Sequence, residues 1–61
     1  MKVYRASTEG GWSIIIAHTD IQSAYEMAAG ADRGYVDAEY GVFEMDLVYT
    51  NATDPQILDE F

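Results

Sequence analysis

The sequence contains no cysteine, one histidine, one proline and only three basic residues. Without cysteine the chain has no disulfide, and one histidine without thiols makes a structural zinc site unattainable. The longest purely apolar run, residues 14–17, is far too short to cross a membrane, and the N-terminal residues lack the apolar core of a signal peptide. We therefore expect a protein of the bacterial cytoplasm that folds without covalent or metal support.

The length bounds the fold. Sixty-one residues predict a single domain, 1–61, and 49% hydrophobic residues make the chain too apolar to be disordered. A core of this size rarely contributes more than about 3–5 kcal/mol to stability. Efficient packing, dimerisation or a partner must supply any further stability, so we expect a monomer or a dimer.

Charge is the most unusual feature of the composition. Eleven acidic residues face three basic ones, for a net charge of −8. The imbalance is concentrated in residues 31–61, which hold eight acids against Arg33 alone, whereas residues 1–30 hold three acids against two bases. Such a field excludes nucleic acid and anionic membranes as direct partners, because both require cationic side chains.

The first half of the chain predicts a hairpin and a helix. Residues 2–8 and 12–17 read as antiparallel strands joined by a glycine turn, and the isoleucines of the second indicate a strand buried on both faces or nearly so. Thr19 and Gln22 match a capping box, which predicts a helix that begins at Thr19 and stops at Gly30. The expected core face of this helix comprises Ile21, Ala24, Tyr25 and Ala28.

The second half gives weaker patterns. After a loop at 31–34, residues 35–40 predict a short strand, Gly41 ends it, and residues 42–50 predict a clearer one. In that second strand Phe43 and its alternate residues should face the core, while Val42 and Glu44 face outward. Asp54 and Pro55 predict the start of a C-terminal helical turn. The expected class is α+β, with a small antiparallel sheet in β-β-α-(β)-β order and one helix packed on one face.

The sequence does not favour an enzyme. His18 lies beside Asp20, with serines at positions 7, 13 and 23, but a nucleophile needs its base within hydrogen-bond reach. No nucleophile-elbow motif is present, and so short a chain has little room for a walled cleft. We expect no catalytic residues, no enzyme activity and no cofactor.

A metal site is also not expected. Asp37, Glu39, Glu44 and Asp46 could gather if residues 35–40 and 42–50 form a hairpin, and their oxygens would suit calcium or magnesium. However, the calcium-loop motif is absent, and alternate side chains on a strand project in parallel instead of converging on one ion.

The same four carboxylates make a better surface than a pocket. Side chains two residues apart on a strand are separated by about 6.6–6.8 Å, so acidic strands can imitate a short run of phosphates. Tyrosines among the acids would stack on arginine. The alternatives are that the acids serve only solubility and that the tyrosines belong to the core edge. The predicted partner-binding residues are Asp32, Tyr35, Asp37, Glu39, Tyr40, Glu44, Asp46, Asp54, Asp59 and Glu60.

In length, charge and lack of cysteine, the chain resembles the small phage-encoded inhibitors of bacterial defence, among them the anti-CRISPR proteins and the anti-restriction proteins. The resemblance covers the whole chain in composition and rests on no diagnostic motif. It implies a DNA mimic that evades host defence through a protein–protein interaction, blocking target DNA recognition by a CRISPR-Cas effector complex.

Two other interpretations remain open. The hairpin-then-helix order from Lys2 to Ala29 is similar to the partial RNase H-like domain of HicB-type antitoxins, which implies neutralisation of a basic RNA-cleaving toxin. The proline- and glycine-bearing segment of that family and its DNA-binding segment are missing here. Alternatively, the aromatic residues could serve the interface of a dimeric accessory subunit.

Overall fold

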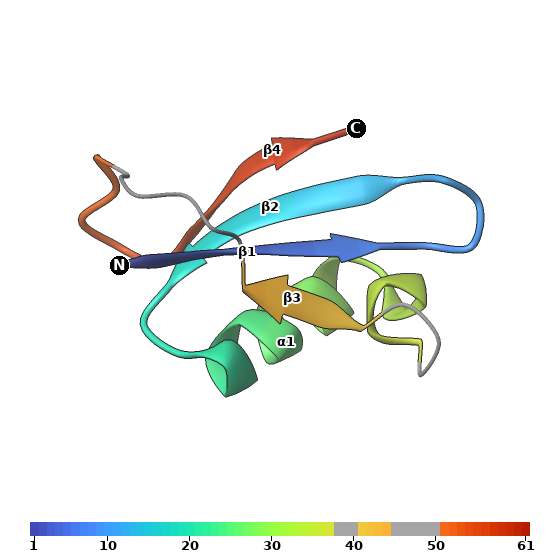
Figure 1. Cartoon of the computed structure of the whole chain (residues 1–61), viewed down its shortest axis with the longest axis horizontal. Helices are drawn as coiled ribbons and strands as arrows, with labels where there is room; N and C mark the ends of the chain where they lie inside the picture. Colours follow the sequence, from blue (N-terminus) through green and yellow to red (C-terminus); the bar gives the residue numbers. More distant parts are fainter. Residues whose placement is uncertain (38–40, 45–50) are drawn as a thin grey trace.

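The computed structural model describes residues 1–37, 41–44 and 51–61. Strands β1 (Lys2–Ser7) and β2 (Ser13–His18) form an antiparallel hairpin and are followed by helix α1 (Ile21–Ala31) and the 3-10 helix η1 (Arg33–Val36). Strand β3 (Val42–Glu44) pairs with β1, and β4 (Gln56–Glu60) pairs with β2, both antiparallel. The sheet order is therefore β3-β1-β2-β4, with the hairpin in the centre (Figure 1).

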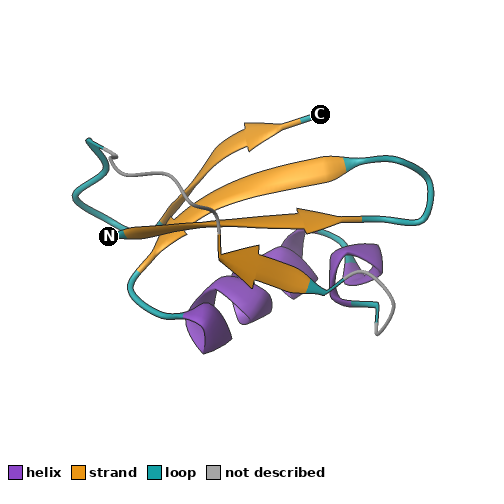
Figure 2. Cartoon of the chain, viewed as in Figure 1, coloured by secondary structure: helices purple, strands orange, loops and turns teal. Residues whose placement is uncertain are grey.

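The α+β class, the antiparallel sheet and the N-terminal hairpin are confirmed. Figure 2 shows both helical segments on the same side of the strands. The register pairs Tyr4 with Ile16 and Ala6 with Ile14, which directs these four side chains to the helix-covered face. There they pack against Ala24, Ala28 and Tyr35 to form the buried core. Small alanines on the inner face of α1 suit a close approach of the helix to the sheet.

The N-cap of helix α1 lies one position later than the expected Thr19, and the helix ends one position after the expected stop at Gly30. Asp20 is its N-cap, because the Asp20 carboxylate accepts the Ser23 N–H at 2.8 Å, and Thr19 donates its hydroxyl to that carboxylate. Gly30 lies within the helix, which ends at Ala31. Ala24 and Ala28 are buried as predicted.

The predicted burial is wrong for the outer part of the helix face. Ile21 and Tyr25 are exposed, and Met27 packs at the edge of the core. Of the three isoleucines in β2, Ile14 and Ile16 are fully buried, whereas Ile15 points to the opposite face and is half-buried.

Two predictions for residues 35–44 are wrong. Tyr35 and Val36 lie in η1 instead of a strand, because the Asp32 carboxylate accepts the Gly34 N–H and starts a helical turn. In β3, Val42 packs against the core while Phe43 is 58% exposed, the reverse of the expected alternation. Pairing of Phe43 with Arg5 sets this register, and a shift of one residue exchanges the two faces of a strand. The other residues of the predicted strands, 38–40 and 45–50, lie outside the described residues.

The prediction of a C-terminal helical turn is also wrong. Residues 56–60 form strand β4, because they supply the backbone hydrogen bonds that the outer edge of β2 would otherwise leave unpaired. Pro55 directly precedes the strand, a position where a missing N–H costs no ladder bond. Long-range pairing has overridden the local Asp-Pro signal.

Candidate binding pocket beside Trp12

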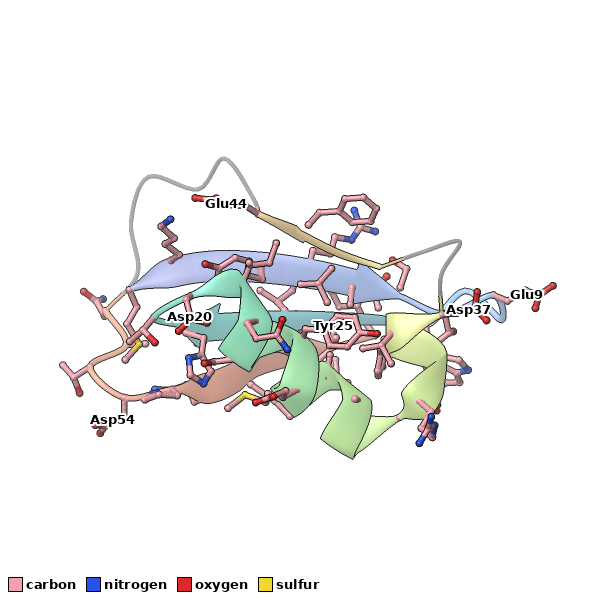
Figure 3. All side chains as sticks on the ribbon, turned by 90° about the horizontal axis from the view of Figure 1, so that it is seen from below. Glu9, Asp20, Tyr25, Asp37, Glu44 and Asp54 are labelled. Carbon is pink, nitrogen blue, oxygen red and sulfur yellow. The ribbon has the colours of Figure 1, made fainter. Side chains whose placement is uncertain are left out.

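The predicted binding residues divide among several places on the molecule. Glu44 lies on β3, whereas Asp59 and Glu60 lie on β4, so the two groups flank the sheet at opposite edges, roughly 14 Å apart at the usual strand spacing. Glu44, Asp37 and Asp54 occupy separate margins in Figure 3. The described acids therefore do not form one row on a single strand pair. Glu39, Tyr40 and Asp46 lie outside the described residues.

Three of the predicted residues do meet at one place. A pocket of about 280 Å³ is lined by Trp12, Ala31, Asp32, Tyr35 and Glu60. These residues come from the β1–β2 turn, the end of α1, η1 and β4. Asp32 and Glu60 are exposed, as predicted, but Tyr35 is only 3% exposed and forms the inner wall, a correction to its expected surface position.

The turn between β1 and β2 holds Trp12. The Thr8 N–H donates to the Trp12 carbonyl at 2.8 Å, and the Trp12 N–H donates to the Thr8 hydroxyl at 3.1 Å. Gly11 has a φ of 92°, a value that only glycine adopts readily, and so closes the turn. The Trp12 indole lies beside Gly10, where an added Cβ would be 3.6 Å from its Cδ1 atom. The backbone of Trp12 is thus fixed while its side chain remains 64% exposed.

The 3-10 helix packs closely against the same turn. A Cβ at Gly34 would lie 3.2 Å from the Thr8 methyl carbon and 3.2 Å from Asp32 Oδ1, so only glycine fits without displacing these neighbours. Asp32 Oδ1 accepts the Gly34 N–H at 2.8 Å. This close approach brings the Asp32 carboxylate and the Tyr35 ring to the turn that carries Trp12.

Strand β4 supplies the remaining wall. Phe61 and Ser13 exchange backbone hydrogen bonds in both directions, and Glu60 stands opposite Ile14 in the register. Because Ile14 faces the helix-covered side, Glu60 faces the same side and reaches Tyr35. The pairing of β4 with β2 therefore carries Glu60 to the pocket from a position 25 residues after Tyr35.

The electrostatic character of the pocket is negative. Burial raises the pKa of the Tyr35 phenol, and the nearby charges of Glu60 and Asp32 and a hydrogen bond with Glu60 raise it further. The pocket also adjoins the C-terminus of α1, where the helix dipole is negative and the last turn carries no basic residue. Charge and dipole together favour a cation at this place.

Of the three basic residues, Lys2 and Arg5 have contacts elsewhere on the molecule, and Arg33 follows Asp32 in η1 but is not among the residues that line the pocket. Lys2 forms an ion pair with Glu44 at 3.8 Å, in which both side chains are more than half exposed, so the pair contributes little to stability. Arg5 donates to the Ser13 hydroxyl at 3.4 Å. The residues that line the pocket include no lysine, arginine or histidine.

His18 and Asp20 have structural contacts. His18 Nδ1 accepts the Thr19 N–H at 2.9 Å, and Asp20 caps α1 through Ser23. The Ser23 N–H and hydroxyl, in that order, lower the pKa of the Asp20 carboxyl. Ser7 and Ser13, two of the serines that a nucleophile for His18 would have to come from, hydrogen-bond each other at 3.2 Å at the far end of the hairpin.

Trp12 was not among the predicted binding residues. Its position after Gly10-Gly11 is nevertheless a usable signal for exposure, because a residue at a tight turn has few neighbours to cover it. The predicted tyrosine-and-acid composition is thus present, but with tryptophan as the exposed aromatic.

Within the described ranges, no three acidic or histidine side chains gather closely enough to hold a metal ion. No helix in that part of the chain has the length and hydrophobicity needed to cross a membrane. A second depression of about 250 Å³ between α1 and β3 is lined by Ile21, Gln22, Tyr25 and Val42. The described residues that line it are uncharged and mostly apolar.

Comparisons with protein-family models, curated proteins and solved structures found no match to this chain.

Proposed function

We propose that this protein is a non-catalytic acidic inhibitor that binds the basic surface of a nucleic-acid-binding protein. The net charge of −8 supports long-range attraction to a cationic surface, which accelerates encounter and weakens with salt. Among such partners we favour a CRISPR-Cas effector complex, whose protein reads its DNA motif through basic residues. In that role the chain would be a DNA mimic encoded by a phage and acting in the bacterial cytoplasm.

The observation that carries the proposal is the pocket beside Trp12. It joins two exposed carboxylates and an exposed indole in one concave place, with no basic side chain in its lining to neutralise them. Aromatic residues surrounded by complementary polar groups are the usual composition of a binding hot spot. Acids kept only for solubility would have no reason to converge on an aromatic residue.

The acidic residues outside the pocket make a second, longer-range contribution to partner binding. Asp37, Glu44, Asp54 and Asp59 are exposed on different margins of a molecule only 29 × 17 × 16 Å in extent. A positively charged groove that surrounds a nucleic acid could face several of these margins together. The proposal therefore assigns specificity to the pocket and attraction to the remaining surface.

Capture from a bacterial extract tests the function. The tagged protein is incubated with the extract at low salt, and bound material is eluted in parallel with a salt step and with duplex DNA. We expect a nucleic-acid-binding complex that leaves the resin under both conditions, because DNA and the inhibitor compete for one basic surface. Binding that resists both salt and DNA would contradict the proposal.

The same experiment separates the two alternatives. The hairpin-then-helix order over residues 2–31 supports an antitoxin related to the HicB type, which would instead capture a small basic ribonuclease and protect cells from it. An accessory subunit would form a stable homodimer whose assembly persists at high salt. Either result would replace the inhibitor proposal.

A further inference from the structure

We infer that the pocket beside Trp12 binds the guanidinium group of an arginine side chain. This inference rests on the proposed function, and it names the chemical group on the partner that anchors the complex. It concerns the pocket lined by Trp12, Ala31, Asp32, Tyr35 and Glu60.

Two carboxylates provide the charge complement. Asp32 Oδ1 already accepts the Gly34 N–H, which fixes the carboxylate and leaves Oδ2 for a ligand. Glu60 projects into the pocket from β4, whose pairing places it opposite Ile14, and its carboxylate offers two acceptor oxygens. The Asp32 carboxylate is thus oriented before any ligand arrives, and the backbone that carries Glu60 is held by the sheet. Orientation in advance lowers the entropy cost of binding.

The exposed indole provides a flat surface for a planar cation. One part of the Trp12 ring lies against Gly10, and the side chain is 64% exposed. A guanidinium group stacks on tryptophan better than on the other aromatic residues, through both dispersion and the attraction between cation and ring. An indole so exposed on a 61-residue domain has an evident use as such a surface.

The size of the pocket suits one side chain. Its volume of about 280 Å³ lies just below the 300–1,000 Å³ typical of sites for drug-sized molecules or cofactors. A calcium ion is a poor alternative because it takes six to eight oxygen ligands, and the described residues bring only two carboxylates here. An arginine side chain needs no more than these two acids and the ring.

Arginine is favoured over lysine by geometry. The guanidinium group presents several N–H donors in one plane, so it can meet two carboxylates while it stacks on the indole. The ammonium group of lysine is a strongly hydrated point charge that gains little from a flat aromatic surface.

A titration with small probes tests the inference without any partner protein. N-acetyl-arginine amide, the matching lysine amide and the neutral citrulline amide are each added to ¹⁵N-labelled protein. Trp12 is the sole tryptophan, so its indole N–H resonance reports directly on the pocket. We expect arginine to shift this resonance together with the Ala31 and Glu60 amides, lysine to shift them less, and citrulline to leave them in place.

A matched pair of double variants supplies the control. Asp32→Asn with Glu60→Gln removes two charges at the pocket and keeps the hydrogen-bond acceptor for the Gly34 N–H. Glu26→Gln with Asp54→Asn removes the same charge at exposed positions outside the pocket. The pocket variant should lose at least about tenfold in arginine affinity, the effect of losing one charge-assisted hydrogen bond, and the control less than about twofold.

The possible results separate this inference from the proposed function. Equal shifts with all three probes, or equal losses in both double variants, would overturn the arginine site. If arginine binds as expected but extracts yield no basic partner, the inhibitor function fails and the pocket assignment stands. If a partner is captured and the pocket variant still binds it fully, the function stands and the anchoring role fails.

Discussion

The central hairpin and the outer strands of this protein differ in what they contribute. Strands β1 and β2 supply Val3, Tyr4, Ala6, Ser13, Ile14, Ile16 and Ala17, all of them buried. Every residue of β4 is exposed, and β3 buries only part of Val42. The hairpin therefore holds the fold together, whereas the outer strands present acids and apolar side chains to the surroundings.

This difference teaches how a small domain can combine stability with recognition. A 61-residue core has few residues to spare, and here they are placed in two central strands and the inner face of one helix. Residues on the outer strands can then change with little loss of stability. Glu60 illustrates the division, since its strand is exposed but its side chain completes the pocket beside Trp12.

The largest expected effect comes from the hairpin. Ile14 is completely buried, so Ile14→Ala should lower the free energy of unfolding by about 2–5 kcal/mol, most of what so small a core supplies. Urea denaturation followed by circular dichroism measures it. The matched change on β4, Ile57→Ala, should cost less than about 1 kcal/mol because Ile57 is 43% exposed. Equal losses in the two variants would refute the division between centre and edge.

A smaller effect is expected at two glycines. Gly34→Ala should destabilise by about 1–3 kcal/mol, because the new methyl group must displace Thr8 or Asp32. Gly30→Ala should stabilise by about 0.5–1 kcal/mol, because Gly30 is an exposed helical residue with nothing within 4 Å of the added carbon. Thermal denaturation of both variants checks the signs, and loss of stability at Gly30 would contradict the observed helix end.

The smallest effect concerns acid stability at the helix cap. The folded-state pKa of Asp20 is below its ordinary value of 3.8, so its stabilising contribution is present above 3.8 and is lost as the pH falls through the lowered folded value. Asp20→Asn keeps a capping side chain but cannot titrate. The variant should therefore have a shallower decline of stability with acid than the wild type. Identical acid profiles would show that Asp20 does not cap α1.

Local patterns in the sequence predicted the first half of the fold. The hairpin and α1 depend on contacts between residues close in the chain, such as the turn from Thr8 to Trp12 and the cap at Asp20. The second half depends on distant partners. Strand β4 forms because β2 has an open edge, and the face that Phe43 occupies is set by its pairing with Arg5. Short-range spacing contains no information about either pairing.

The pocket shows the same limit. Composition alone indicated an acidic surface with aromatic residues, and Asp32, Tyr35 and Glu60 were among the predicted residues. Composition could not show that Tyr35 would be buried, because that burial depends on how η1 packs against the turn at Thr8. Trp12 enters the site only when the hairpin turn and η1 are seen together.

The most direct test of the account measures stability and partner affinity in the same two double variants. The pocket pair is Asp32→Asn with Glu60→Gln, and the control pair, with the same charge, is Glu26→Gln with Asp54→Asn. We predict that the pocket pair loses at least about tenfold in affinity for the captured partner beyond the control, while both retain the wild-type free energy of unfolding or exceed it. Equal losses of affinity in the two pairs would show that total charge alone governs binding, and would contradict the assignment of recognition to the pocket beside Trp12.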